Sequence, residues 1–168
     1  MVHFVGIRAR LSNSTYRSMR RWAGMTVAAL QRRTAAAGAV LLVLGFLTGV
    51  LLAQAMTHHI DADLHQILAA HFIAVLGCLW LVALALTLPM LRYGEAGRRR
   101  LVLLTAIPAY GNWGVTAVKS FFHVSGVGLT GERANDVVFG ALSALVVIPS
   151  FAAAVAWAYG LLGTRSND

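Results

Sequence analysis

A histidine lies inside a long apolar run, at a depth where an imidazole ring needs a specific partner. His71 comes four residues after Ile67, which begins a run that ends at Leu91. Strongly polar groups are costly in the hydrocarbon core, and each one there is a default functional candidate. An ordinary hydrogen bond to a neighbouring helix would satisfy the ring. A neutral imidazole nitrogen is also a standard axial ligand of haem iron, so His71 is a candidate metal ligand.

A second group of polar residues recurs at helical spacing in a later apolar segment. The group consists of Pro108, Asn112, Thr116, then Lys119 or Ser120, and finally His123. Residues spaced in this way share one side of a helix, and this side should face the bundle interior or a subunit contact. With Tyr110 and Trp113 beside it, the stripe could form a cavity wall. Asn and Thr that merely bond across helices would explain the same pattern.

The proline in this stripe has a consequence for the helix that carries it. Pro108 lacks an N–H group and should bend the helix near Gly111 and Gly114. Such a bend would open space beside Tyr110 and Trp113.

Two loops carry further polar residues. The segment MTHHIDADLHQ contains His58, His59, Asp61, Asp63 and His65. These residue types can bind zinc, but their spacing lacks a helical HxxxH pair, so we expect an ordinary hydrophilic loop. In the segment GVGLTGERAND, we expect positive φ angles at Gly126, Gly128 and Gly131 and a helix cap at Asp136.

The elements that position these residues follow from composition. Of the 168 residues, 58% are hydrophobic and 12% are charged, and the mean hydropathy is +0.71, which excludes an ordinary soluble globule. The apolar stretches are Ala35 to Met56, Ile67 to Leu91, Leu101 to about Val124, and Val137 to Leu162. Each is long enough to cross the bilayer as a helix, and none shows the alternation of a barrel strand. The sequence therefore predicts an all-α integral membrane bundle of four transmembrane helices.

The distribution of arginine predicts the orientation of the bundle. Residues 1–34 contain seven arginines and no acidic residue, and Arg92 and Arg98 to Arg100 lie between the second and third stretches. Because basic residues favour the cytoplasmic side, we expect both termini inside, and a place in the bacterial inner (cytoplasmic) membrane. We divide the chain into a basic arm at 1–34, a transmembrane domain at 35–162 and a tail at 163–168. The arginines set topology in this interpretation, so no nucleic acid partner is expected.

Other kinds of chemistry find little support in the sequence. The single cysteine, Cys78, lies in an apolar run and offers no disulfide framework or CxxC site. Phosphate-loop, zinc-protease and serine-hydrolase motifs are also absent.

Several segments together resemble a known family. Ala70-His71 opens the second stretch, LALTLPMLRYG closes it, and Tyr110-Gly111-Asn112-Trp113 lies in the third. In this order and spacing, over about residues 35–162, the chain resembles the small membrane isomerases that include styrene oxide isomerase and hydroxylaminobenzene mutase.

The resemblance implies a haem b at a subunit contact within a homotrimer, with His71 as the iron ligand and the open face towards a small aromatic substrate. In one branch of the family, ferric iron acts as a Lewis acid in converting an epoxide to an aldehyde without net redox change. In the other, hydroxyl moves from nitrogen to the ring of an arylhydroxylamine and an aminophenol forms. The aromatic-small-Asn-Trp segment looks closer to the mutase branch, and Thr116 stands where the epoxide isomerases carry a tyrosine. Gly77 stands where family members commonly carry an asparagine.

This resemblance assigns expected roles and leaves two other classes open. Asn112, Tyr110 and Thr116 are the expected catalytic residues, of which Asn112 would orient the bound group and Tyr110 would exchange a proton. Trp113 is expected to bind the cofactor as an aromatic wall. Alternatively, His71 and His123 could clamp one haem, as in a b-type cytochrome. A cofactor-free transporter or assembly-factor subunit is the remaining alternative, in which the polar stripe lines a pathway or a partner contact.

Overall fold

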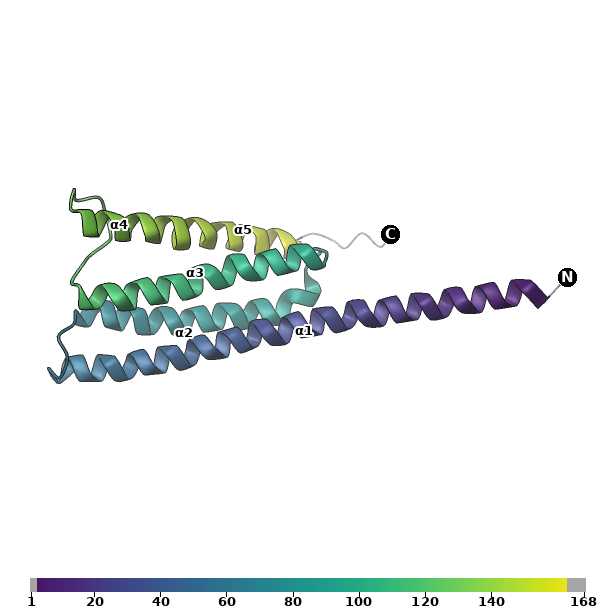
Figure 1. Cartoon of the computed structure of the whole chain (residues 1–168), viewed down its shortest axis with the longest axis horizontal. Coiled ribbons are helices and arrows are strands. Elements are labelled where there is room, and N and C mark those ends of the chain that lie inside the picture. Colours follow the sequence, from purple (N-terminus) through teal and green to yellow (C-terminus); the bar gives the residue numbers. More distant parts are fainter. Residues whose placement is uncertain (1–2, 163–168) are drawn as a thin grey trace.

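The fold is a bundle of long helices joined by short connections. The computed structural model describes residues 3–162, with side chains from residue 27 to residue 162. The elements are α1 (His3–Met56), α2 (Leu64–Thr87), the 3₁₀ turn η1 (Leu88–Met90), α3 (Glu95–Phe121), α4 (Arg133–Leu142), the π turn η2 (Ser143–Val147) and α5 (Ile148–Leu162). Figure 1 shows them as side-by-side rods, in which α4 and α5 continue one another and α1 extends beyond the bundle.

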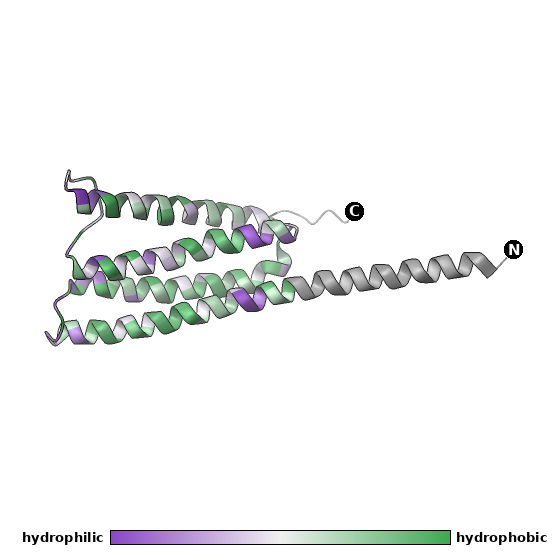
Figure 2. Ribbon diagram, viewed as in Figure 1, coloured by the Kyte–Doolittle hydropathy of each residue, from purple (hydrophilic) through white to green (hydrophobic). Residues whose placement is uncertain are grey.

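The expected all-α membrane bundle is confirmed. Four helical segments are long and apolar enough to cross a bilayer: Val27–Met56, Leu64–Met90, Glu95–Phe121 and Arg133–Leu162. No strand occurs between residues 3 and 162. Figure 2 shows an apolar belt across the rods, with hydrophilic segments where α1 leaves the bundle and at the starts of α3 and α4. The chain is therefore a multi-pass membrane protein.

The helices begin earlier than the predicted apolar stretches. Asp63 caps α2, because its Oδ1 accepts from the backbone N–H of Gln66 at 3.1 Å, so that helix begins at Leu64. Hydropathy marks only the membrane core, whereas polar residues at the bilayer surface can still be helical. The backbone of α1 likewise continues through residues 3–34, so no break in the helix separates the basic arm from the first span. The predicted tail at 163–168 lies outside the described residues.

Two expectations about the loop before α4 are wrong. The N-cap position is Glu132, and Asp136 lies one turn further on, where its carboxylate accepts from the backbone N–H groups of Thr130 and Gly131 at 2.9 and 3.2 Å. Asp136 therefore closes the preceding loop, instead of capping the helix. Positive φ occurs at Gly126 and Gly131 among these glycines and does not occur at Gly128.

Close approach of α1 and α2 depends on small residues. Thr34, Gly38, Leu41, Gly45 and Thr48 form a buried stripe along α1 with three- or four-residue spacing. A Cβ atom at Gly45 would lie 3.0 Å from the Cβ of Ala74 on α2. Small residues allow helices to pack closely in lipid, where hydrophobic burial provides little drive for association.

The end of the bundle at which α1 extends beyond it is tied by hydrogen bonds between the α2–α3 region and α5. The hydroxyl of Tyr93 donates to the backbone oxygen of Ala156 at 2.7 Å, and the indole N–H of Trp157 donates to Thr87 Oγ1 at 3.0 Å. Gly160 faces Tyr93 so closely that a Cβ atom there would lie 2.7 Å from the ring. The segment LALTLPMLRYG thus anchors α5 to the end of α2.

The fourth span contains a wide turn that the sequence analysis did not predict. In η2, the backbone N–H of Ile148 donates to the oxygen of Ser143, five residues earlier. Pro149 follows directly. Because a proline ring presses on the carbonyl group four residues before it, the wider π turn relieves the clash while the rod continues.

Candidate functional site

The imidazole of His71 is held by the backbone of α1. Its Nδ1 lies 2.8 Å from the carbonyl oxygen of Gly45. A carbonyl can only accept, so in the neutral ring Nδ1 carries the hydrogen and Nε2 carries the lone pair. Within residues 27–162, Nε2 has no hydrogen-bond partner. This is the arrangement that a metal-ligating histidine usually has, with one ring nitrogen oriented by a carbonyl and the other free to ligate.

A glycine one turn along α1 leaves room for this ring. A Cβ atom at Gly49 would lie 3.2 Å from Nδ1 and 3.3 Å from Cε1 of His71. Gly45 and Gly49 form a G-x-x-x-G pair, FLTG following Gly45, which is a signal for close helix packing. That signal could have identified the α1 side of the site, but the sequence-based prediction did not use it.

Tyr110 and Trp113 point from α3 towards α1. The Tyr110 hydroxyl donates to the backbone oxygen of Ala37 at 2.6 Å, and the Trp113 indole N–H donates to Thr48 Oγ1 at 3.0 Å. Both polar atoms therefore tie α3 to α1. Their predicted roles in proton exchange and as a wall beside a cofactor stay predictions.

Asn112 and Thr116 are hydrogen-bonded to each other, and Asn112 lies at a cavity. Thr116 Oγ1 donates to Asn112 Oδ1 at 3.4 Å, and Asn112 lines a cavity of about 180 Å³ between α2, α3 and α5. The cavity is also lined by Gly77, Trp80, Pro108, Ala109 and Ser150. Pro108 thus lies beside open space, although α3 remains one helix through it. Ser150 belongs to this site and was not predicted.

The close packing around Gly77 explains why this position lacks the asparagine that the resemblance leads us to expect. A Cβ atom there would lie 2.8 Å from Leu41 Cδ2 and 3.3 Å from the Cβ of Ala109. An asparagine at this position would require the side chain of Leu41 to move. Three helices meet at this glycine, so the missing amide is replaced by close packing.

Within one chain, His71 and the residues that line the Asn112 cavity lie on different sides of α2. His71 turns towards Gly45, whereas the α2 residues Ile73, Leu76, Gly77 and Trp80 line the cavity. Six residues separate His71 from Gly77, and at 3.6 residues per turn they differ in direction by about 120°. Of the predicted site residues, Asn112 lines the cavity, whereas His71, Tyr110, Trp113 and Thr116 do not.

His123 is paired with Asp61 at the end of the bundle. It lies after the end of α3 with φ at +52°, and its Nε2 is 3.6 Å from Asp61 Oδ1 at the exposed end of the bundle. His71 lies seven residues into α2, about 10 Å along the axis from Leu64. A single haem clamped by both histidines stays a prediction. In the part of the chain with described side chains, no group of three His, Cys, Asp or Glu residues could hold a metal ion.

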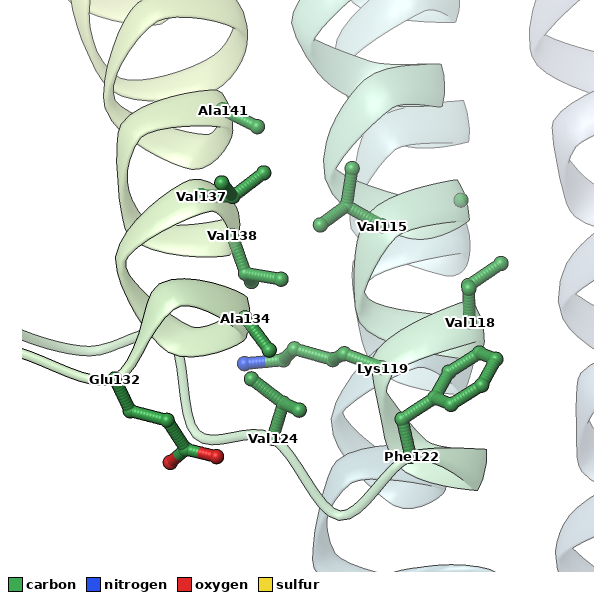
Figure 3. Close-up of a pocket in the computed structure, with 11 residues that line it drawn as sticks. Val115, Val118, Lys119, Phe122, Val124, Glu132, Ala134, Val137, Val138 and Ala141 are labelled. Carbon is green, nitrogen blue, oxygen red and sulfur yellow. The ribbon is translucent and has the colours of Figure 1, made fainter.

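A second, larger apolar pocket lies between α3 and α4, at the end of the bundle that carries His123. Its volume is about 600 Å³, and its lining includes Val115, Val118, Val137 and Val138. Figure 3 shows Lys119 reaching across from α3 below these valines, with Glu132 at the edge. The Lys119 ammonium donates to the backbone oxygen of Ser125 at 2.7 Å, so it fastens the loop that follows α3.

Comparison with known proteins identifies the family of the chain. A family described as styrene oxide isomerase matches residues 30–162. The chain is also 30% identical over 148 residues to hydroxylaminobenzene mutase HabB of Ectopseudomonas oleovorans, covering 84% of this chain and 85% of that protein. No solved structure matches the chain. A match over nearly the whole membrane bundle shows that the chain belongs to the styrene oxide isomerase family of membrane isomerases and mutases.

Proposed function

We propose that the chain is a haem-dependent isomerase that rearranges an arylhydroxylamine to an aminophenol. The observation that carries the proposal is the Nδ1 contact of His71 with Gly45, which leaves Nε2 available. The relative named hydroxylaminobenzene mutase supports this reaction for the present chain. Transfer of hydroxyl within one molecule requires no external oxidant or reductant.

The residues present fit a haem b at His71. Nδ1 of His71 is bonded to a carbonyl oxygen and Nε2 remains available, and the exposed apolar side chains of Phe72 and Leu68 lie beside His71 in the sequence of α2. When bound, ferric haem would supply a Lewis acid that polarises the N–O bond of the substrate. His71 would hold it, and Gly45 would orient the ring.

Other residues of the chain would position the substrate. With Oδ1 occupied by Thr116, the Asn112 amide group presents its N–H donors to the oxygen of the bound hydroxylamino group. The apolar helices exclude bulk water, which strengthens each such hydrogen bond. Thr116 acts through Asn112 and is a positioning residue in this scheme.

We further propose that the protein functions as a homotrimer in the bacterial inner membrane. The fourth span supports an assembly, because only 11% of its apolar window is buried inside the chain, against 39% for the second span. An assembly would also allow His71 of one copy to face the Asn112 cavity of another. Native mass spectrometry from detergent should give a trimeric mass, and a monomer that remains active would contradict this part of the proposal.

An absorption spectrum and two parallel incubations test the proposed function. Protein purified in detergent should show a Soret band and should convert N-phenylhydroxylamine to an aminophenol. An epoxide such as styrene oxide should be converted more slowly. Because the matched family is described as styrene oxide isomerase, the epoxide reaction is the second candidate, and faster conversion of styrene oxide to its aldehyde would favour it. A colourless, iron-free protein made with ample porphyrin supply would exclude both.

A further inference from the structure

We propose that the cavity between α2, α3 and α5 binds one aromatic ring and that Ser150 recognises the N–H or O–H group attached to that ring. The inference rests on the proposed function only for the identity of the natural substrate. It names a residue that nothing in the sequence pattern singled out and assigns it a part in specificity.

The size of the cavity sets the class of ligand. Its volume is about 180 Å³, and an apolar protein cavity of about 150 Å³ is known to hold benzene. A single ring with one small substituent therefore fits. Trp80, Pro108 and Ala109 provide aromatic and aliphatic walls.

The polar groups of the cavity lie on two different helices. Asn112 comes from α3 and Ser150 from α5, and both line the same space. The Asn112 oxygen already accepts from Thr116, so the amide offers donors. The Ser150 hydroxyl makes no hydrogen bond to any residue in the range 27–162, and it can accept as well as donate.

These two groups complement a hydroxylamino substituent better than an epoxide. A hydroxylamino group carries N–H and O–H donors and an acceptor oxygen, so it can bond to Asn112 and Ser150 together. An epoxide oxygen can only accept and leaves the acceptor capacity of Ser150 unused. A site that bonds to a substrate N–H or O–H discriminates strongly against an analogue that lacks it.

The π turn explains how Ser150 reaches this cavity. Ser143–Val147 contains one residue more than a regular α turn needs, which rotates the following helix by about 100° relative to α4. Ser150 is half-buried at the cavity while its neighbour Phe151 is 74% exposed. Wide turns of this kind frequently occur at functional sites.

Binding of unreactive analogues to the purified full-length protein tests the assignment. Aniline keeps N–H donors and has no N–O bond, whereas toluene has the same ring without donors. We expect Ser150→Ala to weaken aniline binding about three- to tenfold, as loss of one hydrogen bond would, and to leave toluene binding nearly unchanged. Equilibrium dialysis in one detergent measures both, since partitioning into micelles is common to all variants.

Two further variants separate recognition from structure. Ser150→Thr keeps the hydroxyl and should bind aniline like the wild type. Ser143→Ala removes a serine of the same span that does not line the cavity and should have no effect. Unchanged aniline binding in Ser150→Ala, or an equal loss for toluene, would overturn the proposal.

The outcome is independent of the cofactor. If the Ser150 effect is found in a protein without a Soret band, the cavity assignment stands and the proposed function fails. If Ser150→Ala rearranges N-phenylhydroxylamine with the wild-type KM, the function stands and the cavity assignment fails.

Discussion

The two nitrogens of the His71 ring have different surroundings, and this difference determines which nitrogen is available as a ligand. Nδ1 is bonded to the Gly45 carbonyl oxygen at 2.8 Å, so the lone pair lies on Nε2. In a purely structural histidine of a membrane helix, both nitrogens would be expected to find partners. The free Nε2 is therefore the strongest sign of a ligand in the described part of the chain.

Replacement of His71 by Ala should remove haem and activity together. The variant loses the only nitrogen proposed to hold the iron, so the Soret band should disappear, and added imidazole should partly restore it. His123→Ala is the matched control, because His123 is exposed and pairs only with Asp61. Stoichiometric haem in His71→Ala would remove His71 from the ligand role.

Replacement of Thr116 by Val should lower turnover while leaving the haem spectrum intact. The change removes the hydroxyl that donates to Asn112 Oδ1, so the amide is no longer held with its donors towards the cavity. We expect kcat/KM for N-phenylhydroxylamine to fall about three- to tenfold. Thr105→Val is the control, since Thr105 is buried in the same helix and bonds only to Leu101. An equal loss in both variants would indicate a packing effect.

At this scale, the sequence predicts the residues that are unusual for their surroundings and misses those that are ordinary. His71, Asn112 and Thr116 are polar residues in apolar helices, so the cost of burying them draws attention to them. Ser150 does not stand out, because a small hydroxyl in a membrane helix normally bonds to its own backbone. The side that each polar group faces also depends on the rotation of its helix, and a hydropathy profile gives no information about that rotation.

At the scale of the element, α1 is both a membrane span and one side of the histidine site. Gly45 and Gly49 allow the His71 ring to lie against the α1 backbone. Without a Cβ atom at either position, the ring and the helix can be in direct contact. The geometry of the ligand is thus set by a helix that carries no metal-binding side chain of its own.

Replacement of Gly49 by Val should weaken haem binding although the ligand is unchanged. The added side chain would begin 3.2 Å from Nδ1 and push the ring from its carbonyl partner. Loss of such a supporting contact typically costs about 10- to 100-fold in metal affinity, measured here as haem lost during gel filtration. Gly140→Ala is the matched control, because nothing lies within 4 Å of a Cβ atom there. Full haem retention in Gly49→Val would contradict the supporting role of Gly45.

The spans were predictable because each needs an apolar run of a length fixed by the bilayer. Their ends were not, because they depend on single contacts such as the Asp63 cap on Gln66. The π turn before Pro149 was also missed, since a proline in an apolar run can be accommodated in several ways.

At the scale of the whole molecule, the arginine distribution predicts which end of the bundle faces the cytoplasm. Arg98 to Arg100 lie at the start of α3, on the side where α1 leaves the bundle (Figure 1). The opposite end carries the loops with His58 and Thr130. Both termini should therefore be cytoplasmic.

Labelling of single introduced cysteines tests this topology. The native Cys78 is buried and should not react with a membrane-impermeant maleimide. Thr130→Cys should be labelled in cells whose inner membrane is intact, and Arg99→Cys only after permeabilisation. Both positions are exposed, so access alone decides the result. The reverse pattern would invert the molecule and place His71 in the cytoplasmic half.

The carbonyl group that orients His71 belongs to the main chain, and this makes the orientation unusually tolerant of sequence change. No replacement of the side chain at position 45 deletes that oxygen, and a bulkier residue there can only displace α2 from it, as the 3.0 Å approach to Ala74 indicates. Distant homologues can therefore diverge freely in the polar residues of the first helix and still present the same nitrogen, provided that small residues persist at the crossing.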